Sequence, residues 1–366
     1  MRECDMKSLL RYGLLVAMFA SRGYAQSLDD LPNYQGDNSQ FGEIRTWGNE
    51  TMMNMLRLWQ LGIKEQQRGL RFVDTLPSGA SAIGALYTGV ADLGLMGHHC
   101  WPMETLGFYE VFAYEPLEIT VATGAYDVAA KMPANVVFVN KQNPLSKLSL
   151  KQLDGIFGEQ RTGGWKGMKW SSESARSAKE NIRTWGQVGL TGDWADKPIH
   201  PYGYDLSGNS FCFSMQRMIF GGGDKWNPKL REFALNEVGL LLSPGPRPPQ
   251  GCEVIVDALA HDPYGIAYTA VQCARKTSVV KPLAIAAKEG GPYVEPSKTT
   301  IQNRTYPLTE SIYVYINRQP GKPVEPKLRE FLRYILSRQG QHDVAQDNGY
   351  LPLTADIVRD QLRKIE

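Results

Sequence analysis

Hydrophobic and polar residues alternate along the chain in two recurring patterns. Apolar residues return every three to four positions in 51–61, where TMMNMLRLWQL predicts an amphipathic helix. Strands are expected at 117–123, where apolar and polar residues largely alternate, and at 136–140, which begins with four consecutive apolar residues. Elements of both kinds alternate without an internal repeat, so we predict an α/β fold. Further strands are expected at 70–74, 92–96, 265–269 and 312–317, and further helices at 80–88, 149–157, 210–220, 252–259, 327–337 and 355–364.

Local signals mark the ends of several of these elements. Ser149 is the expected N-cap of the helix at 149–157, and the glycine triplet at 221–223 is a strong stop for the helix before it. Residues 158–200 are rich in Gly, Ser, Lys and Trp without a clear period, which predicts a long surface excursion. The proline-rich stretch at 243–250 is expected to be a loop or linker.

The first 25 residues have the pattern of an export signal. Arg2, Lys7 and Arg11 precede an apolar run at 13–20, and small residues lead to an expected cleavage near Ala25. The run is too short to cross a bilayer, which takes about 20 residues. A buried N-terminal helix is the alternative. We expect a soluble mature protein in the periplasm, without a lipid anchor at the signal junction because no cysteine follows the apolar run there.

Composition and charge narrow the class of protein. The 366 residues are 42% hydrophobic and 21% charged, which is a globular composition, and the length suits two domains. The chain has 40 basic and 38 acidic side chains; four of the basic and two of the acidic ones lie in 1–25. The remainder therefore carries 36 of each and is neutral. Without a basic tract we expect no nucleic-acid partner and no binding to anionic membranes.

Four cysteines remain beyond the signal: Cys100, Cys212, Cys252 and Cys273. An even number in an oxidising compartment allows two disulfides with three possible pairings. Four buried thiols are the alternative. Cys252 opens a predicted helix and Cys273 follows the next strand, so these two could meet.

The familiar motifs of catalysis and cofactor binding are not found in the sequence. It has no G-x-S-x-G, no Walker loop, no H-E-x-x-H and no G-x-G-x-x-G after a strand. His98 and His99 form the one histidine pair, for which a polar pocket or a surface position is favoured over a metal site. We therefore expect no enzyme activity, no metal and no cofactor.

Three turns that open predicted helices are more informative. The stretches 46–51, 77–81 and 205–210 place Gly, Ser, Thr or Asn at the start of a helix. Free N–H groups and a partial positive charge at such a point can hold an oxyanion. Each turn alone could simply be an N-cap. Their recurrence favours a ligand site where helix starts face a cleft.

Eight stretches, in order, are similar to those of a known family. They are GNETM at 48–52, SGASAI at 78–83, ADLGLMGHH at 91–99, VFVNKQNPL at 137–145, SGN at 207–209, GIAY at 265–268, YPL at 306–308 and GYLPL at 349–353. Over roughly residues 40–366 the chain thus resembles the substrate-binding proteins of phosphate ABC transporters.

That resemblance implies the type II periplasmic binding fold, in which two α/β lobes enclose a ligand cleft. Lobe 1 is expected at 26–117 plus 307–366 and lobe 2 at 118–306. The implied function is capture of inorganic phosphate or a similar oxyanion by a monomer. Delivery would be to an ABC permease in the inner membrane, without chemistry on the ligand.

The resemblance also implies which residues bind the ligand, although some cleft positions depart from the family's pattern. His98 stands where one branch has Arg, and Glu310 lies where another Arg is common. Arg217, Arg45 or Arg304 could restore a positive charge, but solvated or helix-face positions are favoured for them. The implied ligand-binding residues are Asn49, Glu50, Thr51, Ser78, Gly79, His98, Ser207, Gly208 and Asn209.

Two functions from other classes stay open. Because the arginines are missing, the fold could have lost anion binding and serve as an interaction, scaffold or sensor protein. A phosphatase is a weaker alternative, since the sequence offers no metal cluster and no activated nucleophile.

Overall fold

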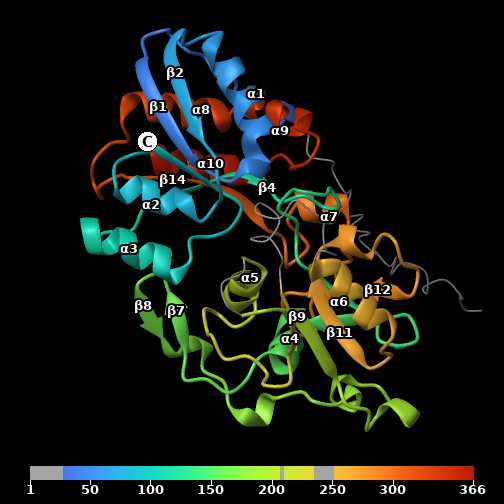
Figure 1. The fold of residues 1–366 in the computed structure, drawn as a ribbon. Helices are drawn as coiled ribbons and strands as arrows, with labels where there is room; N and C mark the ends of the chain where they lie inside the picture. Colours follow the sequence, from blue (N-terminus) through green and yellow to red (C-terminus); the bar gives the residue numbers. More distant parts are fainter. Residues whose placement is uncertain (1–27, 207–209, 235–250) are drawn as a thin grey trace, which may run out of the picture.

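The computed structural model describes residues 28–206, 210–234 and 251–366, which contain two five-stranded sheets with their own helices (Figure 1). The predicted signal at 1–25, the SGN stretch at 207–209 and the predicted loop at 243–250 lie outside the described residues. Within the described part, no helix combines the length and the apolar character that crossing a membrane requires.

The first sheet has the order β2-β1-β3-β14-β4. Its first three strands run parallel to one another, and β14 is antiparallel to both of its neighbours. Buried apolar residues of these strands pack against helices α1, α8, α9 and α10 in one core, while α2 and α3 enclose a smaller one. The strands are β1 (Phe41–Gly48), β2 (Gly69–Thr75), β3 (Leu93–Met96), β4 (Leu117–Thr123) and β14 (Ser311–Ile316); the helices are α1 (Met53–Lys64), α2 (Ser81–Tyr87), α3 (Pro102–Phe112), α8 (Pro326–Ile335), α9 (Arg338–Gln346) and α10 (Ala355–Ile365).

The second sheet has the order β10-β9-β11-β5-β12 and its own large core. Its strands are β5 (Val136–Asn140), β9 (His200–Tyr204), β10 (Arg231–Phe233), β11 (Gly265–Thr269) and β12 (Val280–Pro282); the helices of this half are α4 (Leu150–Phe157), α5 (Ser210–Met218), α6 (Gly251–Ala260) and α7 (Lys298–Gln302). Two short ribbons complete it, β6 (Lys147–Ser149) with β13 (Ala284–Ala286) and β7 (Gly164–Lys166) with β8 (Lys169–Ser171). Both sheets combine parallel and antiparallel pairs, so the predicted α/β class is confirmed.

The chain passes between the sheets twice. Strand β4 pairs with β14 along its whole length and therefore belongs to the first sheet. The lobe boundary expected at 117/118 would separate this strand from its partners. The first crossing instead lies in residues 124–135, after Thr123, and the return precedes Ser311.

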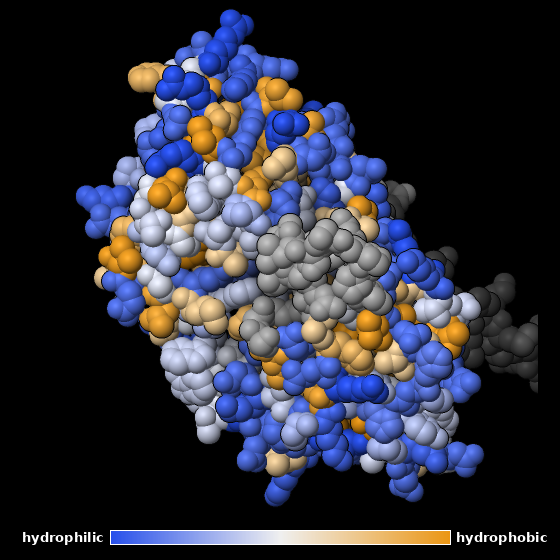
Figure 2. Space-filling model, in the orientation of Figure 1, coloured by the Kyte–Doolittle hydropathy of each residue, from blue (hydrophilic) through white to orange (hydrophobic). Residues whose placement is uncertain are grey.

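Most predicted elements are confirmed within one to three residues, and Ser149 caps α4 as expected, accepting a hydrogen bond from the N–H of Gln152 at 3.2 Å. Helix α3 was not predicted. Its apolar residues point both inward, as Phe108 does, and outward, as Met103 and Val111 do, so no single stripe marks it. Figure 2 shows hydrophobic side chains gathered on the surface over this helix.

The excursion at 158–200 is held to the second half by a buried ionic cluster. Arg161 donates two hydrogen bonds to the carboxylate of Asp154, at 2.7 and 2.6 Å, and Arg176 lies 3.6 Å from the same group. All three side chains are buried. A guanidinium that donates two hydrogen bonds to one carboxylate holds both side chains in a fixed orientation. Removing either partner would leave a buried charge uncompensated. The cluster thereby anchors the segment that carries the β7–β8 hairpin.

Among the cysteines, Cys252 and Cys273 form a disulfide with their Cα atoms 5.7 Å apart. It joins the first turn of α6 to the segment after β11. Cys212 is a buried thiol and Cys100 a half-buried one. Of the options left open by the sequence, the structure has one disulfide and two thiols.

Candidate functional site

Two of the predicted helix-opening turns, at 46–51 and 77–81, meet the 91–99 stretch at the ends of strands in the first sheet. A Cβ atom built on Gly79 would lie 3.3 Å from Nε2 of His98 and 3.5 Å from Nδ2 of Asn49. Asn49 directly follows β1 and His98 follows β3, and these strands are parallel neighbours. Carboxyl ends of parallel strands are a common position for ligand sites. We call Asn49, Gly79 and His98 the loop cluster.

The turn before Asn49 requires glycine. Gly48 has a φ of +154°, and a Cβ there would lie 2.0 Å from the carbonyl oxygen of Leu95. The N–H of Asn49 then donates to that same oxygen at 3.0 Å. The close approach of the two backbones fixes where Asn49 begins its turn.

Asn49 caps the short 3-10 helix η2 (Glu50–Met52). Its Oδ1 accepts hydrogen bonds from the N–H and the hydroxyl of Thr51, at 2.9 and 2.7 Å. The Thr51 hydroxyl also lies 2.9 Å from that of Tyr350. The Asn49 amide nitrogen thus remains on the side of Gly79, whereas the hydroxyl of Thr51 has partners within the fold. Glu50, the first residue of this helix, is exposed.

The remaining predicted residues do not all reach the loop cluster. Ser78 is exposed, and its Oγ accepts from the N–H of Ala80 at 3.3 Å in the turn that opens α2. Ser207, Gly208 and Asn209 lie outside the described residues and immediately precede α5 in sequence.

His98 is buried and neutral. Its Nδ1 lies 3.0 Å from the carbonyl oxygen of His99, which can only accept, so Nδ1 carries the proton and Nε2 a lone pair. Burial lowers the pKa of His98 to about 4. Its ring stacks on Trp101 with centroids 4.5 Å apart. His98 therefore does not supply the positive charge that an arginine would provide there.

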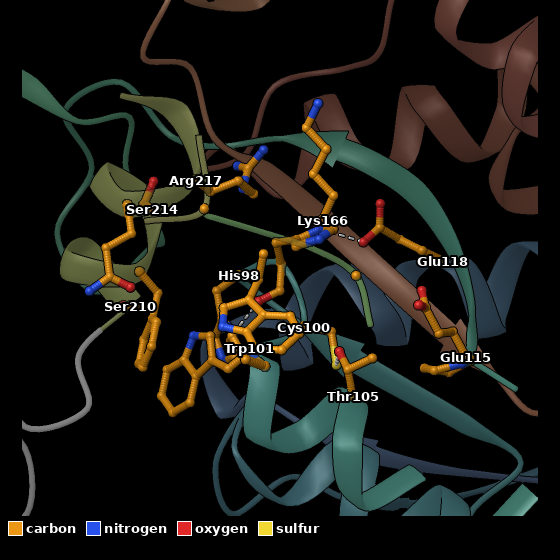
Figure 3. Close-up of a pocket in the computed structure, with 18 of the residues that line it drawn as sticks. His98, Cys100, Trp101, Thr105, Glu115, Glu118, Lys166, Ser210, Ser214 and Arg217 are labelled. Carbon is orange, nitrogen blue, oxygen red and sulfur yellow. Dashed lines mark hydrogen bonds and ion pairs between the residues drawn. The ribbon is translucent and has the colours of Figure 1, made fainter. Parts of the chain in front are cut away.

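A cavity of about 460 Å³ opens beside His98, between the two halves of the molecule (Figure 3). One wall is a face of α5, formed by Ser210, Phe213, Ser214 and Arg217 at the spacing of successive helical turns. We call these four residues the α5 wall. Trp101, at the start of α3, stacks on Phe213 with ring centroids 4.7 Å apart, so the halves touch through aromatic rings.

Arg217 is paired across the cavity with Glu310. The two side chains meet through Nη2 and Oε2 at 3.2 Å. Glu310 is 1% exposed, and burial raises the pKa of its carboxyl against the opposing effect of the Arg217 charge. Glu310 is thus a buried carboxyl group whose charged partner comes from α5.

Two more carboxylates line the opposite side of the cavity. Glu118 lies 2.5 Å from Nδ1 of His99 and accepts from the Tyr315 hydroxyl at 2.5 Å. Although burial pushes its pKa upward, these contacts hold the pKa of Glu118 below its usual range. Glu115 accepts from the N–H of Met168 in the β7–β8 turn at 3.0 Å. Lys166 in β7 also lines the cavity and forms an ion pair with Glu173.

The three arginines near the predicted loops have different roles. Arg217 lines the cavity, whereas Arg45 holds Asp92 in a two-point contact at 3.1 and 2.7 Å. Arg304 donates to Thr123 at 3.4 Å and contacts Ser311. Within the described ranges, no group of three His, Cys, Asp or Glu side chains is arranged to hold a metal ion.

Several cavity residues escaped the sequence interpretation. Phe213 and Ser214 share a helical face with Arg217, and that spacing was a usable signal. Glu118 and Lys166 lie in strands far apart in the chain, and no local pattern links them.

Comparisons with known proteins agree with this architecture. The sequence profile described as PBP superfamily domain matches residues 36–339. The chain is 29% identical to "Phosphate-binding protein PstS" of Pseudomonas aeruginosa over 92% of its length and 90% of that protein. It is 23% identical to the protein of the same name from Staphylococcus saprophyticus over 50% of each. The crystal structure of PstS from Borrelia burgdorferi superposes with a TM-score of 0.50, at 14% identity over 85% of this chain and 99% of that one.

The last comparison bears on the fold alone, and there it agrees with the two-sheet topology described above. The profile match extends from just before β1 into α9, and so includes strands of both sheets, the loop cluster and the α5 wall. On this evidence, the protein belongs to the PBP superfamily.

Proposed function

We propose that the protein captures inorganic phosphate or a related tetrahedral oxyanion in the periplasm and delivers it to an ABC permease of the inner membrane. The observation that carries this proposal is the similarity to the Pseudomonas aeruginosa phosphate-binding protein across 92% of the chain. The function requires binding and release only, so no group needs to act as nucleophile or acid.

In this proposal Arg217 and the loop cluster act on the same ligand. Arg217 offers a permanently charged fork, which matches two oxygens of an oxyanion. The Asn49 amide nitrogen and the backbone N–H of Gly79 are neutral donors that Gly79 leaves accessible for lack of a side chain. Ser207, Gly208 and Asn209 remain predicted donors ahead of α5. Glu50, Thr51 and Ser78 also remain predictions, with weaker support from the contacts described above.

Ligand capture would also require the two halves to move. We infer two lobes, one built on each sheet, that hinge at the two crossings between them and close on the ligand. Relative to the expected division, β4 moves to the first lobe because it pairs with β14. Phosphate would shift the population toward the closed form by contacting both lobes at once.

A thermal melt of the signal-free protein, residues 26–366, tests the proposal. Phosphate, sulfate and molybdate are each added in a concentration series. A ligand bound by the folded state raises the midpoint by mass action, equivalent to about 2.7 kcal/mol at 100 times its Kd. A rise with phosphate supports the proposal, and no rise with any of the three anions overturns it.

One observation favours a second candidate, an interaction or sensor protein that has lost anion binding. His98 is neutral, and the Arg217 guanidinium is already paired with Glu310. If this candidate is correct, none of the anions will shift the melt.

A further inference from the structure

The charges around the cavity are unusual for a site that would take a free dianion. Of the described residues, Glu115, Glu118 and Glu310 supply three carboxyl groups, while Arg217 and Lys166 are the permanent cations. Both cations already have an acidic partner, Lys166 the exposed Glu173 and Arg217 the buried Glu310. A phosphate dianion entering alone would add negative charge to a surface that already has an excess of it.

Glu310 gives a second, independent indication. The side chain is 1% exposed and lines the cavity, and its Oε1 has no hydrogen-bond partner among the described residues. A buried acceptor without a donor is costly and is uncommon in folded proteins. Arg217 satisfies the other oxygen only. A donor that approached Oε1 of Glu310 would therefore satisfy it.

Glu310 lies beside Arg217, whereas the other two carboxylates are separated from it in space. Figure 3 shows Arg217 and Ser214 on one side of the cavity and Glu115 and Glu118 on the other. Aromatic surface from Trp101, Phe213 and Tyr315 lines the same space. A volume of about 460 Å³ lies in the range of about 300–1,000 Å³ that proteins use for organic ligands.

From these observations we infer that the ligand is an organic phosphate or phosphonate that also carries an ammonium group. Its phosphoryl end binds Arg217 and the hydroxyls of the α5 wall. Its ammonium end lies among Glu118, Glu115 and Glu310 and supplies the missing donor, with its carbon chain against the aromatic rings. The inference rests on the proposed oxyanion-binding function and specifies the ligand class for it.

Calorimetric titration of the signal-free protein with three probes tests the inference. 2-Aminoethylphosphonate carries the ammonium group, propylphosphonate replaces it with a methyl group of similar size, and inorganic phosphate has no carbon chain. We expect the amino compound to bind at least tenfold more tightly than propylphosphonate. Equal affinities for these two, or a preference for propylphosphonate, overturn the inference while phosphate binding preserves the proposed function.

Substitutions of single carboxylates test which side chains cause the preference for the amino compound. Glu118→Gln should reduce the preference for the amino compound at least fivefold and leave propylphosphonate binding unchanged or stronger, because one negative charge is removed. Glu115→Gln is a second variant in case the first disturbs the contacts with His99 and Tyr315. Glu110→Gln, on the exposed side of α3, is the matched control and should change nothing. A preference that survives Glu118→Gln and Glu115→Gln together overturns the inference. If none of the three probes binds, the proposed function fails as well.

Discussion

The loop cluster, which reaches the cavity through His98, and the α5 wall differ in their chemistry. Asn49, Gly79 and His98 are neutral, and their orientation is set by strand ends and a cap. The α5 wall contains a permanent positive charge, Arg217, which pairs with a buried carboxyl group of the other half.

The comparison suggests that different groups set the ligand selectivity and the ligand affinity. Backbone and amide dipoles at fixed positions select a shape and cost little to keep in place. The Arg217 guanidinium would add most of the attraction for an anionic ligand. To bind it, Arg217 has to break its ion pair with Glu310 or contact Glu310 and the ligand together. Ligand affinity should therefore depend more strongly on the α5 wall than on the loop cluster.

The largest effect is expected just before the α5 wall. Ser207→Asp would place a carboxylate in the predicted anion loop and should abolish phosphate binding by repulsion. Ser207→Asn keeps a neutral donor and is the control. If calorimetry shows that Ser207→Asp binds phosphate with unchanged affinity, residues 207–209 are not part of the binding site.

Replacing the charge of the α5 wall should have the next largest effect. Arg217→Ala removes a charge-assisted contact, and we expect a tenfold to hundredfold loss of oxyanion affinity, about 1.5–3 kcal/mol. The variant should also be less stable, because Glu310 loses its partner in the interior. Arg45→Ala, at the Asp92 pair away from the cavity, is the control for affinity. Equal affinity losses in both variants would contradict the special role of Arg217.

The neutrality of the loop cluster predicts a pH effect on stability. His98 has a pKa of about 4 in the folded protein against 6.5 ordinarily, so the unfolded chain takes up the proton first as the pH falls. The free energy of unfolding should fall by about 3 kcal/mol between pH 6.5 and 4 on this account. Urea unfolding at several pH values measures it. His98→Gln should flatten this decline, whereas the exposed His261→Gln should not.

The smallest effect is expected from added bulk in the loop cluster. A Cβ at Gly79 would lie 3.3 Å from His98, so Gly79→Ala should shift the cluster slightly and weaken oxyanion binding about twofold to fivefold. Gly84→Ala in α2 is the control, because its Cβ would meet Tyr87 only at 3.7 Å and alanine favours the helix by up to about 1 kcal/mol. An affinity loss for Gly84→Ala as large as for Gly79→Ala would contradict the local explanation.

Elements whose pattern lies within a short stretch of consecutive residues could be predicted from the sequence. The strands β4 and β5 have the bounds that the sequence predicted: β4 largely alternates apolar and polar residues, whereas β5 is buried along its whole length and needs no alternation. Helix-opening turns pointed to Asn49 and Gly79 because glycine and a capping side chain act within a few residues, and their role in ligand binding stays a prediction. Helix α3 has apolar residues on two faces and lacked such a signal.

The charges of the site could not be predicted in this way. The pairing of Arg217 with Glu310 joins residues far apart in sequence, and so does the contact of Glu115 with the β7–β8 turn. The neutral state of His98 depends on its burial and on the His99 carbonyl. These properties arise only when the two halves assemble around the cavity. The sequence showed that His98 and Glu310 depart from the expected arginine pattern, but it did not show which side chains contact them.

A structure of the signal-free protein in complex with phosphate tests the central claim most directly. The account predicts a phosphate with an oxygen about 2.7–2.9 Å from a guanidinium nitrogen of Arg217, and the N–H of Gly79 or the amide of Asn49 donating to the same ion. A phosphate bound away from both groups, with Arg217 still paired only to Glu310, would contradict it.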